Sequence, residues 1–194
     1  MLKLRSVKKV ILATKHPILP LPLAICYNES IPPGRRGRVE KGEQKMKVLV
    51  TWFSAEGNTA KVGRELAEKI GADVFEIVPE VPYTKADIRW VNPLARCNKE
   101  KFGKKDVPVT GSVADFASYD TIYIGFPIWY GCAPNVVNTF CKGYDWSGKK
   151  VVVFATSGGS GIGKTAEKLQ PYVNGAEIVS AKLVKNATEI EVLQ

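Results

Sequence analysis

The stretch Lys47–Ile70 (KVLVTWFSAEGNTAKVGRELAEKI) decides the fold. Its opening run, KVLVTWF at 47–53, is almost wholly apolar and rich in β-branched and aromatic side chains, which predicts a strand buried on both faces. Residues 58–70 then place apolar side chains three or four positions apart, which predicts an amphipathic helix. Gly71 is suited to end that helix in the left-handed conformation. A buried strand followed at once by an amphipathic helix is typical of a parallel α/β sheet.

The alternation of strands and helices continues along the chain. Similar patterns predict further strands at 74–78, 121–126, 150–156 and 177–181, and helices near 133–144 and 161–173. We therefore expect a parallel sheet with helices on both faces. The connection 79–119 is longer than usual and is expected to carry a short helix near 86–90. Thr188 and Glu191 have the spacing of a capping box, which predicts a last helix that only three further residues would leave truncated.

The composition is that of an ordinary globular protein. Of the 194 residues, 45% are hydrophobic and 24% charged, and the mean hydropathy is −0.08. These values exclude a wholly disordered, collagenous or disulfide-scaffold protein. The four cysteines form no CxxC pair and are accompanied by one histidine, which makes a zinc site a poor interpretation. We expect a reduced protein of the cytoplasm.

The formal net charge of +9 belongs mainly to the first part of the chain. Residues 1–45 contain 10 Lys or Arg and 3 Asp or Glu, a net of +7, whereas residues 46–194 contain 18 and 16, a net of +2. The main domain is therefore almost neutral. Its charge does not support nucleic-acid binding, and we expect none.

Residues 1–45 are predicted to be an extension that is separate from the main domain. The apolar run at 17–27 is shorter than the roughly 20 residues that cross a bilayer, and it contains three prolines, so we expect no membrane segment. No A-x-A cleavage pattern follows it. The segment at 31–45 lacks periodicity and is predicted to be disordered. The codons for Lys41–Glu43 can contain a purine-rich bacterial ribosome-binding sequence just upstream of Met46. A second interpretation is therefore that Met46 is the true start and that residues 1–45 are not native.

Three polar, glycine-rich loops follow predicted strands, at the sheet edge where such folds bind ligands. Ser54–Ala60 (SAEGNTA) combines hydroxyls, a glycine and a helix start, which suits a phosphate but equally suits simple helix capping. Pro127–Pro134 (PIWYGCAP) carries two aromatics, which either stack on a planar ligand or complete the core. Thr156–Gly163 (TSGGSGIG) lets a ligand approach the backbone closely.

Together these loops resemble those of the flavodoxin-like family. SAEGNT (54–59) resembles its flavin-phosphate loop, and GFPIWYGCAPNVVNTF (125–140) and FATSGGSGIG (154–163) resemble the two loops that enclose the isoalloxazine ring. PYTKADIRW (82–90) resembles a stretch of small bacterial flavodoxin-like proteins. The resemblance covers most of residues 46–194. It implies a doubly wound α/β fold with five parallel strands in the order 2-1-3-4-5, helices on both faces, and non-covalently bound FMN.

The resemblance also implies which residues contact FMN. The first loop would hold the phosphate, Trp129 or Tyr130 would stack on the flavin, and the backbone of the third loop would line the pyrimidine end of the ring. Glu56 departs from the family pattern, because a hydroxyl is common there. In the related proteins a carbonyl of the second loop can turn toward flavin N5, and Gly131 either has the freedom for such a flip or only fits a tight turn before Pro134. The candidate FMN-binding residues are Ser54, Ala55, Glu56, Gly57, Asn58, Thr59, Ala60, Pro127, Ile128, Trp129, Tyr130, Gly131, Thr156, Ser157, Gly158, Gly159 and Gly161.

The implied function is electron transfer, with the flavin cycling through its semiquinone and hydroquinone and with a redox protein or a small molecule as partner. An NAD(P)H-dependent FMN quinone reductase is the alternative, because a ring covered on one side and a near-neutral domain suit a stacked substrate. A third interpretation comes from GGSGIGKT (158–165), which matches the P-loop pattern of nucleotide hydrolases. Only one short strand follows it, without an aspartate placed to hold Mg²⁺.

Overall fold

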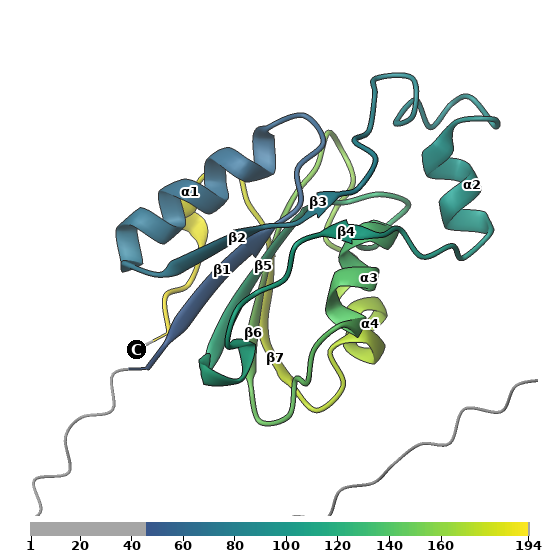
Figure 1. The fold of residues 1–194 in the computed structure, drawn as a ribbon. Helices are drawn as coiled ribbons and strands as arrows, with labels where there is room; N and C mark the ends of the chain where they lie inside the picture. Colours follow the sequence, from purple (N-terminus) through teal and green to yellow (C-terminus); the bar gives the residue numbers. More distant parts are fainter. Residues whose placement is uncertain (1–45, 194) are drawn as a thin grey trace, which may run out of the picture. The chain divides into compact units, whose positions relative to one another are not determined.

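A five-stranded parallel sheet forms the centre of the structure (Figure 1). The computed structural model describes residues 46–193, and the predicted N-terminal extension lies outside them. The strands pair in the order β2-β1-β5-β6-β7. Counted along the chain among themselves, these strands have the order 2-1-3-4-5, so the predicted topology and fold class are confirmed. Their bounds are β1 Val48–Trp52, β2 Asp73–Glu76, β5 Thr121–Pro127, β6 Lys150–Thr156 and β7 Glu177–Leu183.

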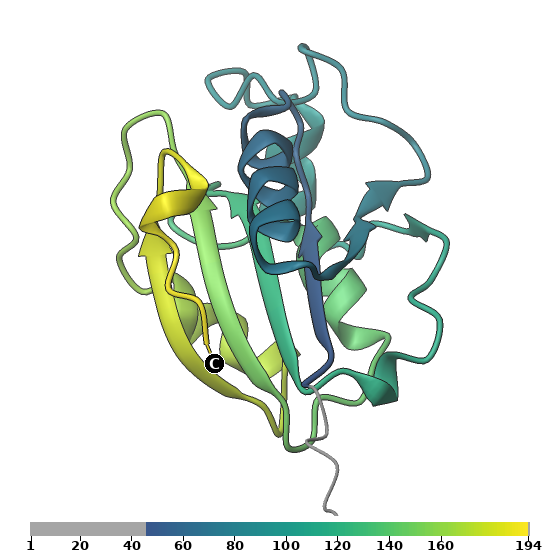
Figure 2. The same ribbon diagram turned by 90° about the vertical axis from the view of Figure 1, so that its left-hand side faces the viewer.

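Both faces of the sheet are buried under helices, as Figures 1 and 2 show. Successive residues of β1 belong to different hydrophobic clusters: Leu49 packs in the cluster that includes α3 and α4, and Val50 packs in the cluster that includes α1. This alternation explains why the first strand has an unbroken apolar sequence. The helix bounds are α1 Asn58–Ile70, α3 Asn135–Lys142 and α4 Thr165–Leu169.

Glycines fix both ends of α1 and its distance from the sheet. Gly57 precedes the helix at φ 86°, and Gly71 follows it at φ 65°, the left-handed conformation predicted for this glycine. Gly63 lies on the buried side, where a Cβ would overlap the indole ring of Trp52 on β1. The glycine therefore allows the helix to pack directly on this large side chain.

The 79–119 connection folds differently from the prediction. Thr84 and Asp87 bond reciprocally to each other's backbone N–H groups, but residues 86–90 form turns instead of a helix, because the Asp87 carbonyl accepts from the Cys97 N–H and the Trp90 carbonyl from the Asn98 amide. The helix of this region is α2, Arg96–Phe102. The predicted strand 74–78 is divided, since Val78–Pro79 (β3) leaves the main sheet and pairs antiparallel with Val109–Thr110 (β4). A 3₁₀ turn, η1 at Phe116–Ser118, leads into β5.

The remaining helices are shorter than predicted. Pro134 caps α3 at its start, and Pro171, which has no N–H, lies in a 3₁₀ turn (η2, Gln170–Tyr172) directly after α4. The predicted capping box at Thr188 is wrong, because the Asn186 side chain accepts from the Thr188 N–H and opens only a 3₁₀ turn, η3 at Ala187–Glu189. Within residues 46–193, no helix is long and apolar enough to cross a membrane.

We expect Gly63→Ala to lower the free energy of unfolding. Alanine favours helices over glycine by about 1 kcal/mol, but its Cβ would overlap the buried Trp52 ring, and overpacking costs about 1–3 kcal/mol. The matched control is Gly159→Ala, where a Cβ meets no atom within 4 Å. Urea denaturation followed by circular dichroism measures both variants. A Gly63→Ala protein as stable as the parent would show that the helix does not pack this closely.

Candidate functional site

A cleft of about 1010 Å³ opens beyond the carboxyl ends of β1, β5 and β6. This is the sheet edge at which doubly wound folds bind ligands, and the volume suits a small molecule. All three predicted loops contribute to it, together with part of the 79–119 connection and the residues after β7. The lining residues are Ser54, Ala55, Glu56, Asn58, Thr59, Lys61, Lys85, Ile88, Arg89, Trp90, Val91, Pro127, Ile128, Trp129, Thr156, Ser157, Gly158, Gly159, Ser160, Val184 and Lys185.

The first loop presents the start of α1 to the cleft. No side chain among the described residues caps this helix, so its first N–H groups are available to a ligand. Thr59 is only 1% exposed, and its hydroxyl lies 2.8 Å from the hydroxyl of Thr156 in the third loop. Backbone donors, hydroxyls and the positive end of the helix dipole together suit a phosphate. The Glu56 carboxylate is exposed and lies at the same cleft.

The third loop uses part of its own backbone donors. The Ser157 hydroxyl accepts from the N–H groups of Gly159 and Ser160, at 3.1 and 2.7 Å. These two donors are therefore engaged within the loop in this structure, although the resemblance implied that the backbone of residues 156–161 faces the ligand. Gly158 and Gly159 have open space around the position of a Cβ, so a ligand can come close to this backbone.

The second loop makes a tight turn directly after β5. Trp129 and Cys132 exchange backbone hydrogen bonds of 3.0 and 3.1 Å, and the two residues between them have positive φ, 54° for Tyr130 and 67° for Gly131. Two successive residues at positive φ define a type I′ turn. The turn separates the two aromatics, since Trp129 lines the cleft and Tyr130 does not.

The Trp129 ring is held edge-on by two other aromatic rings. Its centroid lies 5.7 Å from that of Phe53 and 5.3 Å from that of Tyr83, and both pairs have an interplanar angle of 90°. Such T-shaped pairs add about 0.5–1.5 kcal/mol beyond area burial. The ring of Trp129 is thus fixed in orientation before any ligand arrives.

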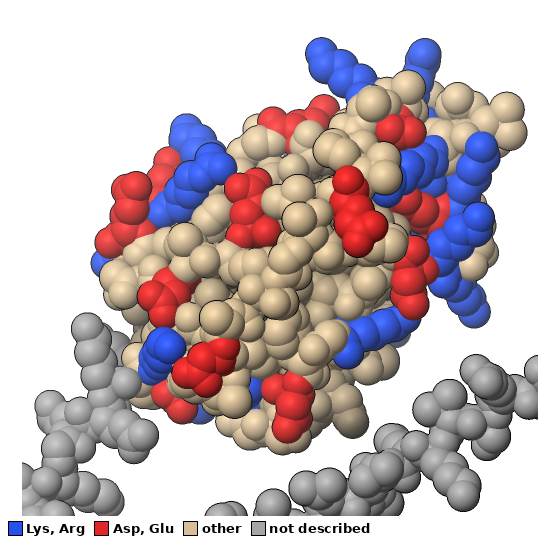
Figure 3. Space-filling model, viewed as in Figure 1, with Lys and Arg blue, Asp and Glu red and all other residues tan. Residues whose placement is uncertain are grey.

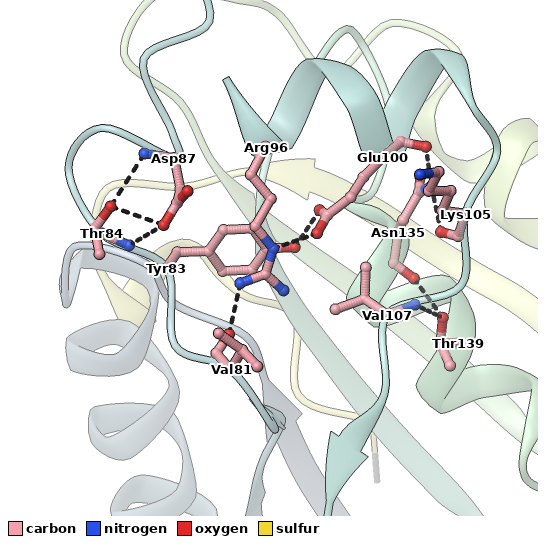
Figure 4. A network of polar contacts seen from close by, with 10 residues as sticks. All are labelled: Val81, Tyr83, Thr84, Asp87, Arg96, Glu100, Lys105, Val107, Asn135 and Thr139. Carbon is pink, nitrogen blue, oxygen red and sulfur yellow. Dashed lines mark hydrogen bonds and ion pairs between the residues drawn. The ribbon is translucent and has the colours of Figure 1, made fainter. Parts of the chain in front are cut away.

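Tyr83 is in turn fixed by a polar network from α2 (Figure 4). Its hydroxyl donates to Glu100 Oε2 at 2.5 Å, and Arg96 Nε donates to Glu100 Oε1 at 2.5 Å. The Arg96 guanidinium also lies 4.2 Å from the centre of the Tyr83 ring. Burial and the hydrogen bond to Glu100 raise the pKa of Tyr83 far above its usual range, so the group remains a neutral donor. The buried Glu100 carboxylate is therefore both paired and hydrogen-bonded.

Tyr130 anchors the turn to the 79–119 connection. Its hydroxyl lies 2.5 Å from Asn98 Oδ1 and 3.2 Å from Cys97 Sγ, and its single proton serves the stronger acceptor, Asn98. The Asn98 amide donates to the carbonyl oxygens of Trp90 and Asn92, at 2.8 and 2.7 Å. One buried asparagine thus joins the second loop to the outer wall of the cleft.

Most of the predicted site residues line the cleft, and five do not: Gly57, Ala60, Tyr130, Gly131 and Gly161. Gly57 supplies the left-handed turn before α1, and Ala60 is buried in the core. The carbonyl of Gly131 accepts from Lys168 Nζ at 3.0 Å. The prediction missed Ser160 and a whole wall, made by Lys85, Ile88–Val91, Lys61 and residues 184–185. Only the resemblance of PYTKADIRW (82–90) pointed to this region, and it assigned no contacts.

The P-loop pattern has no supporting geometry. Lys164 pairs with Glu167 at 3.6 Å, both side chains are at least 70% exposed, and neither residue lines the cleft. The helix that follows, α4, has only five residues. Lys164 is thus a solvated surface residue.

Comparisons with known proteins agree with this geometry. A family model described as flavodoxin matches residues 47–194. A candidate flavoprotein from Bacteroides eggerthii is 36% identical over 74% of this chain and 92% of its own, with a TM-score of 0.67. One from Bacteroides uniformis is 38% identical over 71% of this chain and 89% of its own, with a TM-score of 0.65.

A flavoprotein from Lactobacillus acidophilus, solved in complex with FMN, has the same fold. It is 22% identical over 71% of this chain and 93% of its own, with a TM-score of 0.58. No curated protein matches the chain. The family model covers the whole sheet and all three loops, and two solved structures share more than a third of the aligned residues. The chain therefore belongs to the flavodoxin family.

Proposed function

We propose that this protein binds FMN and transfers electrons. The observation that carries the proposal is that one cleft has an uncapped helix start on one wall and the fixed ring of Trp129 on another. FMN has the two matching parts, a phosphate and a flat aromatic ring. Membership of the flavodoxin family supports the same ligand, and a protein of this fold from Lactobacillus acidophilus has been solved with FMN.

The residues of the cleft fit FMN by their chemistry. The phosphate would be held by the backbone and side chains of Ser54, Asn58 and Thr59 at the start of α1. Trp129 would cover one face of the ring and exclude water there. When bound, FMN supplies the capacity to accept and release one or two electrons. The third loop has no aromatic residue at 156–161, so this loop would not stack a second ring on the flavin.

A second candidate, an NAD(P)H-dependent quinone reductase, is favoured by one observation. Lys85 and Ile88–Val91 extend the cleft beyond the three predicted loops and would give room for a small substrate beside the flavin. We propose the cytoplasm as the location, because Cys97, Cys132 and Cys141 are buried free thiols.

Thr59→Val is expected to weaken FMN binding about 5- to 150-fold, because a buried hydroxyl that lies at the phosphate loop is lost, at a cost of about 1–3 kcal/mol. Thr59→Ser, which keeps the hydroxyl, is the matched control. Fluorescence titration with FMN and with riboflavin measures both variants. Riboflavin should bind the parent protein much more weakly and respond less to the valine. Equal affinity of the parent for the two flavins would contradict the phosphate site.

Trp129→Ala is expected to weaken FMN binding by at least about two- to tenfold, the equivalent of about 0.5–1.5 kcal/mol of stacking. The fluorescence of bound FMN should also rise, since the indole no longer quenches it. Tyr130→Phe is the control, because this ring lies outside the cleft and only its bond to Asn98 is lost. Because phenylalanine keeps the ring at residue 130, this control should bind FMN much more tightly than Trp129→Ala, and an unchanged FMN affinity and fluorescence in Trp129→Ala would contradict stacking on Trp129.

The absorption spectrum of the purified protein, with and without NADPH, tests the proposed function itself. We expect flavin bands after FMN is added, and we expect NADPH alone to leave them unchanged if the protein is an electron carrier. Rapid bleaching would select the reductase instead. A protein that remains colourless after incubation with FMN and gel filtration would refute both.

A further inference from the structure

Four basic residues line the cleft outside the loops assigned to FMN: Lys61, Lys85, Arg89 and Lys185. They come from three distant parts of the sequence, namely α1, the 79–119 connection and the segment after β7. We call them the basic wall. In the view of Figure 3, other Lys and Arg side chains gather over α2, with Asp and Glu side chains among them. The fold thus brings four cations to one cleft of a domain whose net charge is only +2 over residues 46–194.

The charges of the basic wall have no partner in the described part of the chain. The ion pairs among residues 46–193 involve other cations, and none of the four charged groups makes a hydrogen bond there, although the backbone N–H of Lys185 donates to Glu189 Oε2 at 3.3 Å. Glu56 is the one acidic residue among those that line the cleft. Unpaired charges of one sign in a concave site attract a ligand of the opposite sign.

The phosphate of FMN does not account for this charge. At pH 7 a phosphate monoester carries about −1.5 to −2, and the start of α1 already offers it backbone and hydroxyl donors. Four cations against one carboxylate leave a positive excess even after FMN has bound. Lys85, Arg89 and Lys185 lie on segments other than the phosphate loop, which suggests that a second anion occupies the cleft.

The same wall also offers an exposed aromatic surface. Trp90 is 70% exposed and lines the cleft beside Ile88 and Val91. Its backbone is fixed, because the Trp90 carbonyl accepts from the buried Asn98 amide at 2.8 Å. An exposed tryptophan on a fixed backbone, next to unpaired cations, suits a ligand with an aromatic ring and acidic groups.

We propose that the basic wall binds an anionic aromatic small molecule, the redox substrate of the flavin. This inference rests on the proposed function and gives the partner a chemical class. The cations line a cavity and do not form a flat surface, which favours a small molecule over a protein. A phosphorylated nucleotide and a quinone with an acidic substituent share the required chemistry, so the experiment must separate them.

The test uses the FMN-loaded protein and isothermal titration calorimetry. The probes are 2′,5′-ADP and a naphthoquinone sulfonate, with adenosine and the unsubstituted naphthoquinone as uncharged counterparts. The cleft variant is Lys85→Gln with Arg89→Gln. The control variant, Lys99→Gln with Lys104→Gln, removes the same charge from α2 and its end, away from the cleft.

At least one acidic probe should bind, and the cleft variant should bind it about tenfold or more weakly, because hydrogen bonds to a charged group are lost. The control variant should bind like the parent. Binding of 2′,5′-ADP alone would identify a nucleotide substrate, and binding of the sulfonate alone would identify an acidic quinone. Equal binding of an acidic probe and its uncharged counterpart, equal losses in both variants, or no binding would overturn the inference.

FMN affinity is measured separately for each protein. Failure of the parent to bind FMN would refute the proposed function, whereas FMN binding without any acidic probe would refute only this inference. A cleft variant that loses FMN itself would show that the basic wall holds the flavin phosphate, which also overturns the inference.

Discussion

The tight turn at Trp129–Cys132 is the constraint on which the rest of the site depends. Because Tyr130 and Gly131 both have positive φ, the chain reverses at once after β5 and sends two neighbouring aromatic rings in different directions. Trp129 enters the cleft, and Tyr130 bonds to Asn98. A positive φ is rare outside glycine, so the contacts of Tyr130 must offset the cost of its conformation. The residue that faces the ligand and the residue that anchors the loop are therefore adjacent in sequence.

The 79–119 connection is part of the site. Two buried polar side chains of α2 connect it to the cleft. Glu100 bonds to Tyr83, whose ring packs on Trp129. Asn98 bonds to both Tyr130 and the backbone carbonyl of Trp90. A buried polar group is costly unless it is hydrogen-bonded, so each of these networks favours one arrangement over its alternatives. Both aromatic residues of the second loop, Trp129 and Tyr130, are thus positioned by a segment that lies between β2 and β5 and outside the main sheet.

The sequence predicted the parts of the fold that depend on periodicity. The central strands β1, β5 and β6 and the helix α1 have strong apolar patterns, and the bounds of α1 and β6 agree residue for residue. The α2 segment has no such pattern, because its sequence RCNKEKF is largely charged and its support comes from tertiary contacts with Tyr83 and Tyr130. The sequence also could not show which of Trp129 and Tyr130 faces the cleft, since no local preference predicts a tyrosine at positive φ. The basic wall has residues from three segments, and only the fold brings them together.

A crystal structure of the protein grown with FMN tests the central claim most directly. The account predicts the isoalloxazine ring against the Trp129 indole and the phosphate at the first N–H groups of α1, beside Thr59. Tyr130 should keep its bond to Asn98, because the turn is already formed without the ligand. A flavin stacked on Tyr130, or a phosphate held by Lys85 and Arg89 instead of the start of α1, would contradict it.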